Sequence, residues 1–288
     1  MQLKNEPIII IGAARSGTNM LRDIITKIPG FGTWPCDEIN YIWRYGNRDK
    51  DSDEFAEEDL TPQIAKFIIG EFVKIQNKNN FNYVVEKTCA NSLRVSFIRA
   101  IFPNAKYILI TRDGRDVVSS AEKRWKAELD LNYIYQKAKY IPKQDVLYYA
   151  TKYFTNRISK IFSKEDRLAT WGPRFKKIDE VLRNKNIFEI SAIQWSKSVE
   201  LSLEGLSSLS QEQLLHIQYE NFTKSPHDVL PKLLGFLDYK GDEKTLKMLS
   251  SNVKYSSVGK WRSNLSNETL SKISPLINPT LIKLGYEL

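Results

Sequence analysis

The residues that follow the first apolar segment have the spacing of a phosphate-binding loop. In PIIIIGAARSGTNM, Gly12 and Gly17 are placed like the two glycines of the G-x-x-x-x-G-K-[ST] pattern. Thr18 stands where that pattern has lysine, and Asn19 stands where it has the Mg²⁺-binding Ser or Thr. Such a loop can hold an anion on backbone N–H groups at a helix N-terminus, and Arg15 adds a positive charge. The spacing therefore predicts a nucleotide-phosphate site that is poorly equipped for ATP hydrolysis.

A second cationic group follows another apolar segment, KYILITRDGRDVVSSAEKRW. Arg112 is expected at the carboxyl end of a strand, beside the first loop if the two strands are neighbours. Ser120 and Arg124 form an i, i+4 pair on one face of the helix predicted after it. Two guanidinium groups and a hydroxyl can bind an anion. An exposed charged turn followed by a surface helix is the alternative for this stretch.

Two short segments offer residues for group transfer. NYVVEKTCANSLR places Lys87 at the end of a strand, where it can neutralise a transferring group or its leaving oxygen, or can simply be solvated. The neighbouring Asp37 and Glu38 follow the first helix, and a carboxylate there can act as general base toward an acceptor hydroxyl. Their spacing does not choose between them, and a solvated acidic pair is the alternative. We interpret Cys89 as a small buried side chain rather than a nucleophile.

Two segments near the C-terminus can close over a nucleotide. Tyr219 ends the fourth expected strand, and the basic, turn-like SSVGKWR segment carries Ser256, Ser257 and Lys260. Either segment is a candidate for nucleotide contacts, and the spacing does not choose between the two serines.

Alternating strands and helices must position these residues, which predicts an α/β fold with a parallel sheet and right-handed crossovers. The expected strands are Ile8–Ile11, Tyr83–Glu86, Lys106–Thr111 and Leu214–Tyr219, all short and apolar. The expected helices are Ser16–Ile28, Pro62–Gln76, Ser92–Ile101, Asp116–Glu128, Ala192–Leu206 and Pro226–Leu237. Ser225 and Pro226 form a helix start signal, with an N-cap and a proline at the first helical position.

The region 130–183 interrupts this alternation. It is rich in Tyr and Lys and ends in Trp171-Gly172-Pro173-Arg174. We expect a helical insertion over the open end of the sheet, where ligands of such sheets bind, so that it shapes an acceptor site. Residues 1–288 are expected to form a single domain.

Composition restricts the partners of the protein. The 43 Lys and Arg against 34 Asp and Glu give a net charge of +9, which suits an anionic ligand, an acidic glycan or a membrane surface. No nucleic-acid motif accompanies this charge, so no nucleic-acid partner is expected. Two cysteines without a CxxC pattern favour a reducing compartment, and two histidines are too few for a usual zinc site. No apolar run reaches the length of a transmembrane helix.

Together these segments resemble the PAPS-dependent sulfotransferases, particularly the tyrosylprotein enzymes and the bacterial sulfotransferases near them. The run Arg15–Thr18 is similar to the family's loop for the 5′-phosphosulfate, commonly P-R-S-G-T-T, with Ala14 and Asn19 replacing the Pro and the second Thr. IFPNAKYILITRDGR looks like the family's strand and turn, which implies that Arg112 and Ser120 hold the 3′-phosphate. Ser16, Gly17 and Thr18 are the implied loop contacts.

The resemblance implies roles for the remaining residues. Arg124, Tyr219 and Lys260 fall where the family places cofactor contacts, and Ser257 joins them in our prediction. Lys87 and Arg15 are implied to support sulfuryl transfer. Glu38 falls near the family's catalytic glutamate after an allowance of two inserted residues. Cytosolic sulfotransferases have a catalytic histidine after a K-T pair, where this chain has Cys89, which favours Glu38 as the base.

The resemblance covers 7–38, 83–125 and, more weakly, 214–261. It implies a P-loop nucleotide-hydrolase-like parallel sheet flanked by helices, with PAPS (3′-phosphoadenosine 5′-phosphosulfate) as co-substrate and no metal. The implied activity moves a sulfuryl group to a hydroxyl or amine of a glycan, lipid or small metabolite and releases PAP. The tyrosylprotein enzymes are membrane-anchored and lumenal, whereas this sequence predicts a cytoplasmic protein. A P-loop nucleotide or metabolite kinase and a non-catalytic PAP-binding protein are the alternatives.

Overall fold

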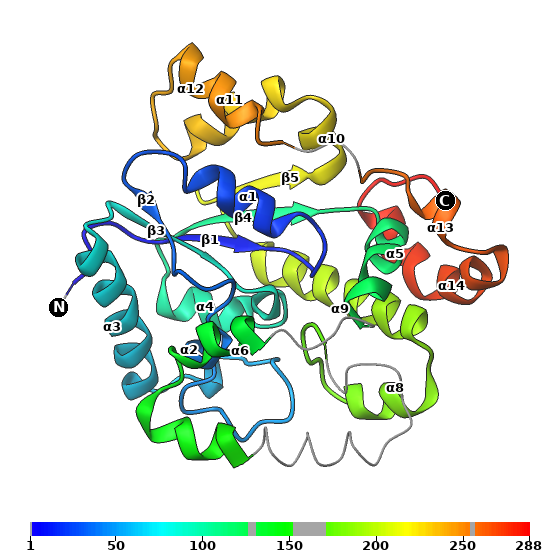
Figure 1. Ribbon diagram of the computed structural model, residues 1–288, viewed down its shortest axis with the longest axis horizontal. Helices are drawn as coiled ribbons and strands as arrows, with labels where there is room; N and C mark the ends of the chain where they lie inside the picture. The colour runs from blue at the N-terminus through cyan, green and yellow to red at the C-terminus, as the bar shows by residue number, and fades with distance from the viewer. Residues whose placement is uncertain (1, 126–130, 152–170, 254–256) are drawn as a thin grey trace.

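The computed structural model describes residues 2–125, 131–151, 171–253 and 257–288. Its centre is a parallel sheet in the order β2-β3-β1-β4-β5 (Figure 1). The strands are β1 (Ile8–Ile11), β2 (Phe31–Gly32), β3 (Tyr83–Lys87), β4 (Lys106–Thr111) and β5 (Leu214–Gln218). Every neighbouring pair is parallel. The predicted α/β class and its parallel sheet are therefore confirmed.

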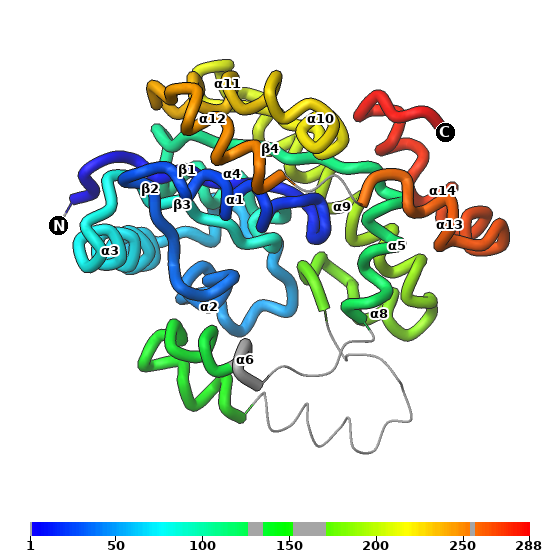
Figure 2. Tube along the Cα trace, turned by 45° about the horizontal axis from the view of Figure 1, so that its top comes forward, coloured from blue at the N-terminus to red at the C-terminus, as the bar shows by residue number. Residues whose placement is uncertain are grey.

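Both faces of the sheet are covered by helices, which explains why β1 is a run of four isoleucines. Ile8 and Ile10 belong to one apolar cluster, and Ile9 and Ile11 belong to another. The first cluster includes residues of α1 (Thr18–Ile25), α11 (Pro226–Phe236) and α12 (Glu243–Ser250), and the second includes residues of α2 (Asn40–Trp43), α3 (Pro62–Asn79) and α4 (Val95–Ile101). Figures 1 and 2 show these two helical layers on opposite sides of the strands.

A third apolar cluster lies beyond the carboxyl end of β1. It joins Val118 of α5 (Gly114–Trp125) and Trp195 of α9 (Ile187–Leu206) to Ile277 of α14 (Asn267–Lys283). The remaining helices are α6 (Leu131–Ala138), α8 (Ile178–Asn184), α10 (Tyr219–Lys224) and α13 (Trp261–Asn264), with 3₁₀ turns at Glu57–Asp59, Cys89–Leu93 and Lys143–Asp145. This cluster anchors α5, which carries part of the predicted second anion site.

Several local details differ from the sequence-based prediction. The helix expected from Ser16 begins at Thr18 because Gly17 takes a left-handed conformation there. Ser225 precedes α11 as expected, but its side chain makes no capping hydrogen bond. Glu128, the expected end of another helix, lies outside the described residues.

The predicted insertion is described in part. Its residue 130 and its residues 152–170 lie outside the described ranges. Within the described part, α6 and α8 are helical, and Figure 1 shows α6 close to α2. The insertion as a unit that shapes an acceptor site stays a prediction.

Candidate functional site

The site forms where three neighbouring strands end. Strand β1 lies between β3 and β4, so Ile11, Lys87 and Thr111 end adjacent strands at one edge of the sheet. The chain leaves β1 for β2 and β3 on one side, while β4 and β5 lie on the other. Such a reversal of strand order is where parallel α/β sheets bind ligands. The predicted phosphate loop, Lys87 and Arg112 are thereby brought together.

Glycine is required at two positions of the phosphate loop. A Cβ on Gly12 would lie 2.7 Å from the carbonyl oxygen of Ile110, so the loop runs directly against β4. Gly17 has φ +91°, and a Cβ there would lie 2.4 Å from the ring of Tyr219. As the N-cap of α1, Gly17 also offers no side-chain acceptor. The first N–H groups of α1 therefore remain available to an anion.

Arginine side chains surround this loop and bond mainly to neutral partners. Arg15 Nε donates to Ser120 Oγ at 2.9 Å. Arg112 Nη1 donates to the carbonyl oxygen of Arg15 at 3.0 Å, and its guanidinium lies 4.4 Å from the ring centroid of Tyr219. Burial and the nearby charges of Arg124 and Arg112 lower the pKa of Arg15. This concentration of positive charge favours a bound anion.

Two buried donors point to the same ligand chemistry. The hydroxyl of Ser16 and Nε of Arg112 are buried and have no hydrogen-bond partner among the described residues. Leaving such a group unsatisfied costs about 1–3 kcal/mol. An anionic group between the loop and Arg112 would satisfy both donors, so these residues fit a phosphorylated ligand.

Asp116 connects the segment 257–261 to this cationic region. The carboxylate accepts from the N–H groups of Gly259 at 2.7 Å and Trp261 at 2.9 Å. Arg112 donates to the carbonyl oxygen of Ser257, whose hydroxyl lies 2.8 Å from the phenol oxygen of Tyr219. The sequence reasoning missed Asp116, although its i, i+4 spacing from Arg112 was a signal.

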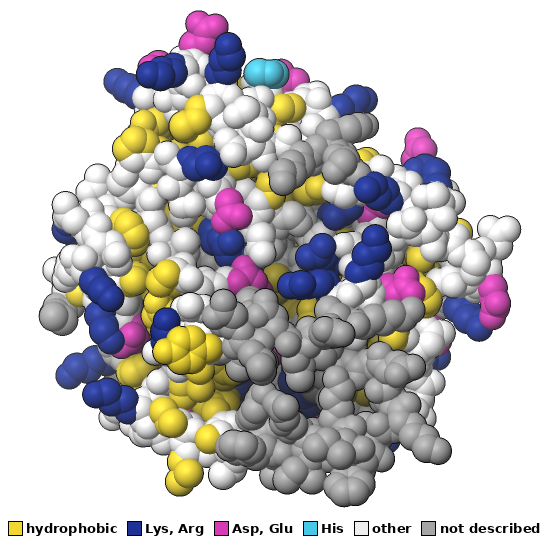
Figure 3. Space-filling model, in the orientation of Figure 1, with side chains coloured by type: hydrophobic (Ala, Val, Ile, Leu, Met, Phe, Trp, Pro, Cys, Tyr) yellow, Lys and Arg dark blue, Asp and Glu magenta, His cyan; other side chains and the backbone are white. Residues whose placement is uncertain are grey.

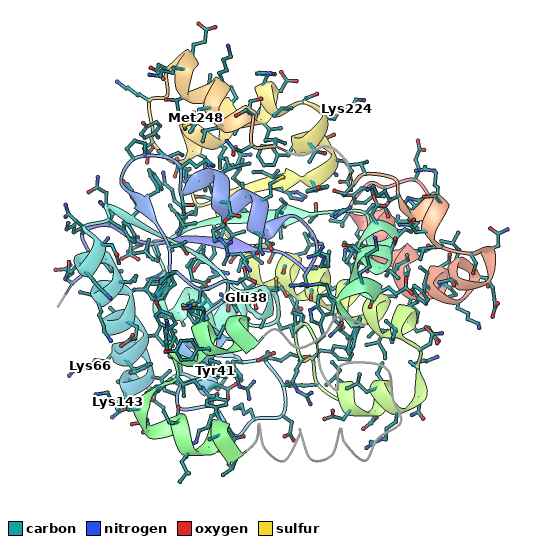
Figure 4. All side chains as sticks on the ribbon, viewed as in Figure 1. Glu38, Tyr41, Lys66, Lys143, Lys224 and Met248 are labelled. Atoms are coloured by element: carbon teal, nitrogen blue, oxygen red, sulfur yellow. The ribbon has the colours of Figure 1, made fainter. Side chains whose placement is uncertain are left out.

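Glu38 and Lys87 meet on the other side of the loop. Lys87 Nζ lies 3.1 Å from Glu38 Oε1 and 3.1 Å from Asp37 Oδ1. The N–H of Cys89 donates to Glu38 Oε1 at 3.2 Å, and Lys137 Nζ lies 3.6 Å from Glu38 Oε2. Figure 4 shows Glu38 near the centre of the molecule, with Tyr41 nearby. The predicted base and the predicted transfer lysine are therefore direct neighbours.

The lysines determine the ionisation of the two carboxyls. Burial alone would raise the pKa of Glu38, but the charges of Lys87 and Lys137 outweigh it and lower the pKa to about 2. Burial likewise opposes ionisation of Asp37, yet Lys87 and Arg22 hold its pKa well below the usual range. Arg22 Nη1 donates to Asp37 Oδ1 at 2.8 Å. Both carboxyls are thus ionised at neutral pH.

Sequence reasoning missed Arg22 and Lys137, which complete this ion network. Arg22 lies four residues after Thr18 on α1, so helical spacing alone could have placed it on the side of the loop. Lys137 lies in the insertion, where no motif marked it. Its contact with Glu38 follows from tertiary packing of α6.

Cys89 lies at the junction of the two halves of the site. Its Sγ is 3.8 Å from Thr18 Oγ1. Burial and the charge of Glu38 raise the pKa of the thiol to about 12. The thiol is therefore protonated at neutral pH, which disfavours a nucleophilic role. Cys89 was expected to be buried, but it is only partly buried.

The remaining predicted residues lie at the margins. Arg124 and Lys260 are exposed, and Asn19 lies in the first turn of α1. Ser256 lies outside the described residues. Figure 3 shows basic and acidic side chains close together over the centre of this face.

The Trp171–Arg174 segment borders the site from the insertion side. Its Trp171 and Pro173 carbonyls accept from Gln194 at 2.8 and 3.2 Å. With Ala13 and Ala14 of the loop, this segment lines a cavity. The segment therefore lies near the start of the loop that follows β1.

Among the described residues, no group of three or more His, Cys, Asp or Glu side chains could hold a metal ion. In the same part of the chain, no helix is both long and apolar enough to cross a membrane.

Comparison with known sequences gives matches of one kind. A family model described as the sulfotransferase family matches residues 7–157, just over half of the chain. The Caenorhabditis elegans protein-tyrosine sulfotransferase A is 18% identical over 315 aligned residues, covering 99% of this chain and 68% of that protein. The Rattus norvegicus protein-tyrosine sulfotransferase 1 is 28% identical, covering 45% of this chain and 38% of that protein. The aligned part of the chain thus covers well under half of the length of the rat relative.

Comparison with solved structures supports the fold. The sulfotransferase domain of the curacin biosynthetic pathway aligns over 100% of both chains, with a TM-score of 0.59 and 16% identity. The sulfotransferase domain of a Synechococcus olefin synthase aligns over 100% of this chain and 97% of its own, with a TM-score of 0.55 and 15% identity. At these identities the likeness concerns the fold, and it agrees with the predicted P-loop-like sheet.

Proposed function

The chain belongs to the sulfotransferase family, and from this premise we propose that it transfers a sulfuryl group from PAPS to an acceptor hydroxyl or amine. The observation that carries the proposal is the pairing of two unlike regions at one sheet edge. Arginines and two unsatisfied donors surround an anion loop, and a buried lysine beside it holds a glutamate. A donor with two anionic ends would bind to the arginines and the loop. The glutamate beside the lysine would remove the proton of the acceptor.

We assign the loop and arginine residues to the donor. Arg15, Ser16, Gly17, Thr18 and Asn19 would hold the 5′-phosphosulfate on backbone N–H groups and side-chain donors. The 3′-phosphate would lie against Arg112, Ser120 and Arg124, and the remaining assigned contacts are Tyr219, Ser257 and Lys260. Bound PAPS supplies a sulfuryl group whose leaving group is a phosphate oxygen.

We assign proton removal to Glu38. Its Oε2 takes the acceptor proton as the acceptor oxygen forms its bond to sulfur. The electron pair of the breaking S–O bond stays with the phosphate oxygen of PAP. Lys87 and Arg15 stabilise the negative charge that develops there. Asp37, which is itself held by Arg22, positions Lys87.

Three further assignments accompany this function. We propose a glycan, lipid or small metabolite as the acceptor class, with a net charge of +9 favouring an acidic one. The two free cysteines favour a cytoplasmic location. We treat residues 1–288 as one catalytic domain, because the site draws on residues from Arg15 to Lys260. The family match does not favour the kinase alternative.

Calorimetry and a turnover assay test the proposal. We expect PAP to bind more tightly than adenosine 5′-phosphate, because only PAP carries the 3′-phosphate. Conversion of PAPS to PAP, screened over glycans, lipids, phenols and peptides, should proceed equally with and without EDTA. Absence of PAP binding, or a strict requirement for Mg²⁺, would contradict the proposal. Tight PAP binding with no transfer to any acceptor would instead indicate a non-catalytic PAP-binding protein.

A further inference from the structure

The segment 87–89, at the carboxyl end of β3, lies against the residues around Glu38. The side chain of Lys87 and the N–H of Cys89 both bond to the Glu38 carboxylate, at 3.1 and 3.2 Å. Thr88 contacts the main chain instead, because its Oγ1 accepts from the N–H of Ile39 at 3.2 Å. This N–H belongs to the peptide unit that directly follows Glu38. Thr88 therefore fixes the backbone from which the proposed base extends.

A buried carboxylate determines the direction of the Thr88 hydroxyl. Thr88 Oγ1 donates to Glu86 Oε1 at 2.6 Å, and both residues are 1% exposed. A hydroxyl carries one proton, so with this proton committed to Glu86 its lone pairs are left to accept from Ile39. Glu86 thus keeps Thr88 an acceptor toward the peptide unit after Glu38.

A second set of contacts connects Glu86 to the same segment of the chain. Asn91 Nδ2 donates to Glu86 Oε2 at 2.7 Å, and Asn91 Oδ1 accepts from Arg94 Nε at 2.9 Å. Arg94 Nη2 in turn donates at 2.6 Å to Oδ1 of Asn40, the first residue of α2. Asn91 and Arg94 are both buried. The contacts that start from the two oxygens of Glu86 therefore end at Ile39 and at Asn40, directly after the proposed base.

We propose, resting on the function above, that Thr88 and Glu86 are positioning residues for Glu38. Thr88 fixes the peptide unit that follows Glu38, and this holds the carboxylate beside Lys87. Glu86 acts through Thr88, whose proton it accepts. A displacement of about 1 Å, even from a change away from the reacting atoms, can cost about 10²-fold in rate. Loss of the Thr88 hydroxyl should therefore slow the chemical step and leave donor binding intact.

The ionised form of Glu86 suits this arrangement. Burial raises the pKa of Glu86 to about 7, while the hydrogen bond from Thr88 and the charge of Arg94 favour ionisation. An ionised carboxylate accepts from both Thr88 and Asn91, whereas a protonated one places a further donor between them. Measurements at pH 8 therefore keep these contacts in the form described above.

The first test removes the Thr88 hydroxyl with little change of shape. The probe acceptor is 4-methylphenol, which is protonated at pH 8 and needs a base, and the readouts are PAPS conversion and calorimetric PAP binding. We expect Thr88→Val to lower kcat roughly 10–100-fold and to leave PAP affinity unchanged, because the donor residues do not move. Thr88→Ser should retain the kcat of the unaltered protein. An unchanged kcat in Thr88→Val overturns the proposal.

Two controls separate positioning from stability. Thr280 of α14 is also buried and donates to the carboxylate of Glu200 at 2.8 Å, so Thr280→Val removes a comparable bond from another part of the molecule. This variant should retain kcat. In a Glu38→Gln background, Thr88→Val should cause little further loss, because no base remains to be positioned. An equal loss in both backgrounds, or an equal loss in Thr280→Val, overturns the proposal.

The second test does not depend on turnover. Hydrogen exchange of the Ile39 amide is followed by NMR at pH 8, and we expect it to be about tenfold faster in Thr88→Val, since a hydrogen bond that opposes local opening is gone. Thr280→Val should leave this rate unchanged. An unchanged Ile39 rate in Thr88→Val overturns the proposal. Failure of the unaltered protein to bind PAP contradicts the sulfotransferase function itself, and the Ile39 rate still decides whether Thr88 fixes this peptide unit.

A paired substitution tests the part of Glu86. Glu86→Gln places an amide donor against either Thr88 or Asn91, so we expect faster exchange of the Ile39 amide and a lower kcat. Adding Asn91→Asp provides each donor with an acceptor again and restores the net charge. The double variant should recover both the slow exchange and most of kcat. A double variant no better than Glu86→Gln alone overturns the assignment of Glu86.

Discussion

The cationic region around Arg15 and the ion network around Glu38 lie at the same end of the sheet. They differ in how far their positive side chains are paired with carboxylates. Arg15 bonds to the hydroxyl of Ser120. Arg112 bonds to backbone carbonyls and lies 3.8 Å from one carboxylate, that of Asp116, which leaves the charge of Arg15 without a carboxylate partner among the described residues. Lys87, in contrast, bonds to two carboxylates. Positive charge is therefore left over in the first region and cancelled in the second.

This difference suits the cationic region to binding of the donor and the ion network to the chemical step. A surplus of fixed positive charge is what an anionic donor requires, and it exists before any ligand arrives. A balanced network keeps charged groups buried without a ligand, but its ions must be rearranged for a carboxylate to act as a base. We therefore expect changes in the two regions to affect different measurements.

The largest effect is expected from Glu38→Gln, which removes the base and retains its shape. Turnover should fall by roughly 10²–10⁴-fold, the usual contribution of general acid–base catalysis. PAP affinity should change little, because the donor residues are in the other region. Turnover rates and calorimetric PAP titrations of the same preparation measure both quantities.

Asp37→Asn is the matched control, since Asp37 contacts the same lysine. We expect a smaller loss of turnover, because Asp37 positions Lys87 rather than removing a proton. A large loss of PAP affinity in Glu38→Gln would show that the two regions are not separable.

Arg112→Ala should produce the converse result. We expect PAP affinity to fall by about 30- to 5,000-fold, since a buried charge-assisted contact is worth about 2–5 kcal/mol when one partner is removed. Adenosine 5′-phosphate should lose much less, because it lacks the 3′-phosphate assigned to Arg112. Competition binding of both nucleotides measures the difference. Equal losses would place Arg112 at a part of the nucleotide that the two ligands share.

Gly12→Ala tests the packing beneath the cationic region. The added Cβ would approach a backbone carbonyl at 2.7 Å, so we expect a loss of about 1–3 kcal/mol in the free energy of unfolding. Gly70→Ala in α3 is the control, because an added Cβ there meets nothing within 4 Å. That change should stabilise the protein by about 0.5–1 kcal/mol. Urea unfolding measures the change in the free energy of unfolding for each variant. Equal changes in the two variants would contradict the close approach of Gly12 to the carbonyl of Ile110.

The smallest effect is expected from pH acting on the ion network. The pKa of Glu38 is lowered from 4.5 to about 2 in the folded protein, so its contribution to stability is complete above pH 4.5 and is lost as the pH falls toward 2. The stability advantage of the unaltered protein over Glu38→Gln should therefore shrink between pH 5 and pH 3. Urea midpoints at pH 7, 5 and 3 check this sign. An advantage that grows on acidification would contradict the ion pairing.

The sheet could be predicted because its strands are buried on both faces. Ile8–Ile11 is apolar throughout, Lys106–Thr111 is apolar between its polar ends, and the bounds of both matched the structure. Strand β2 has only two residues, too few for a pattern. The helix α14 was missed because Pro275 and Pro279 lie inside it, and prolines ordinarily predict a helix end.

The proximity of the phosphate loop, Lys87 and Arg112 could be predicted because each follows or ends a strand, and neighbouring strand ends meet at one edge. The residues that were missed make contacts with residues far away in the sequence. Asp116 reaches a segment 143 residues later, and Lys137 reaches Glu38 from the insertion. Local spacing carries no information on such contacts, because they depend on how distant helices pack.

The bonds from Asp116 to Gly259 and Trp261 determine when, during synthesis of the chain, the proposed nucleotide site can be completed. The donor side is complete only when the segment after 257 has docked onto α5, and 143 residues separate Asp116 from Gly259. At cellular synthesis rates this interval lasts on the order of 10 s. During that time the nascent chain has β1, the phosphate loop and Arg112 but not the last wall of the nucleotide site. The proposed nucleotide site can therefore be complete only after residue 261 has been synthesised.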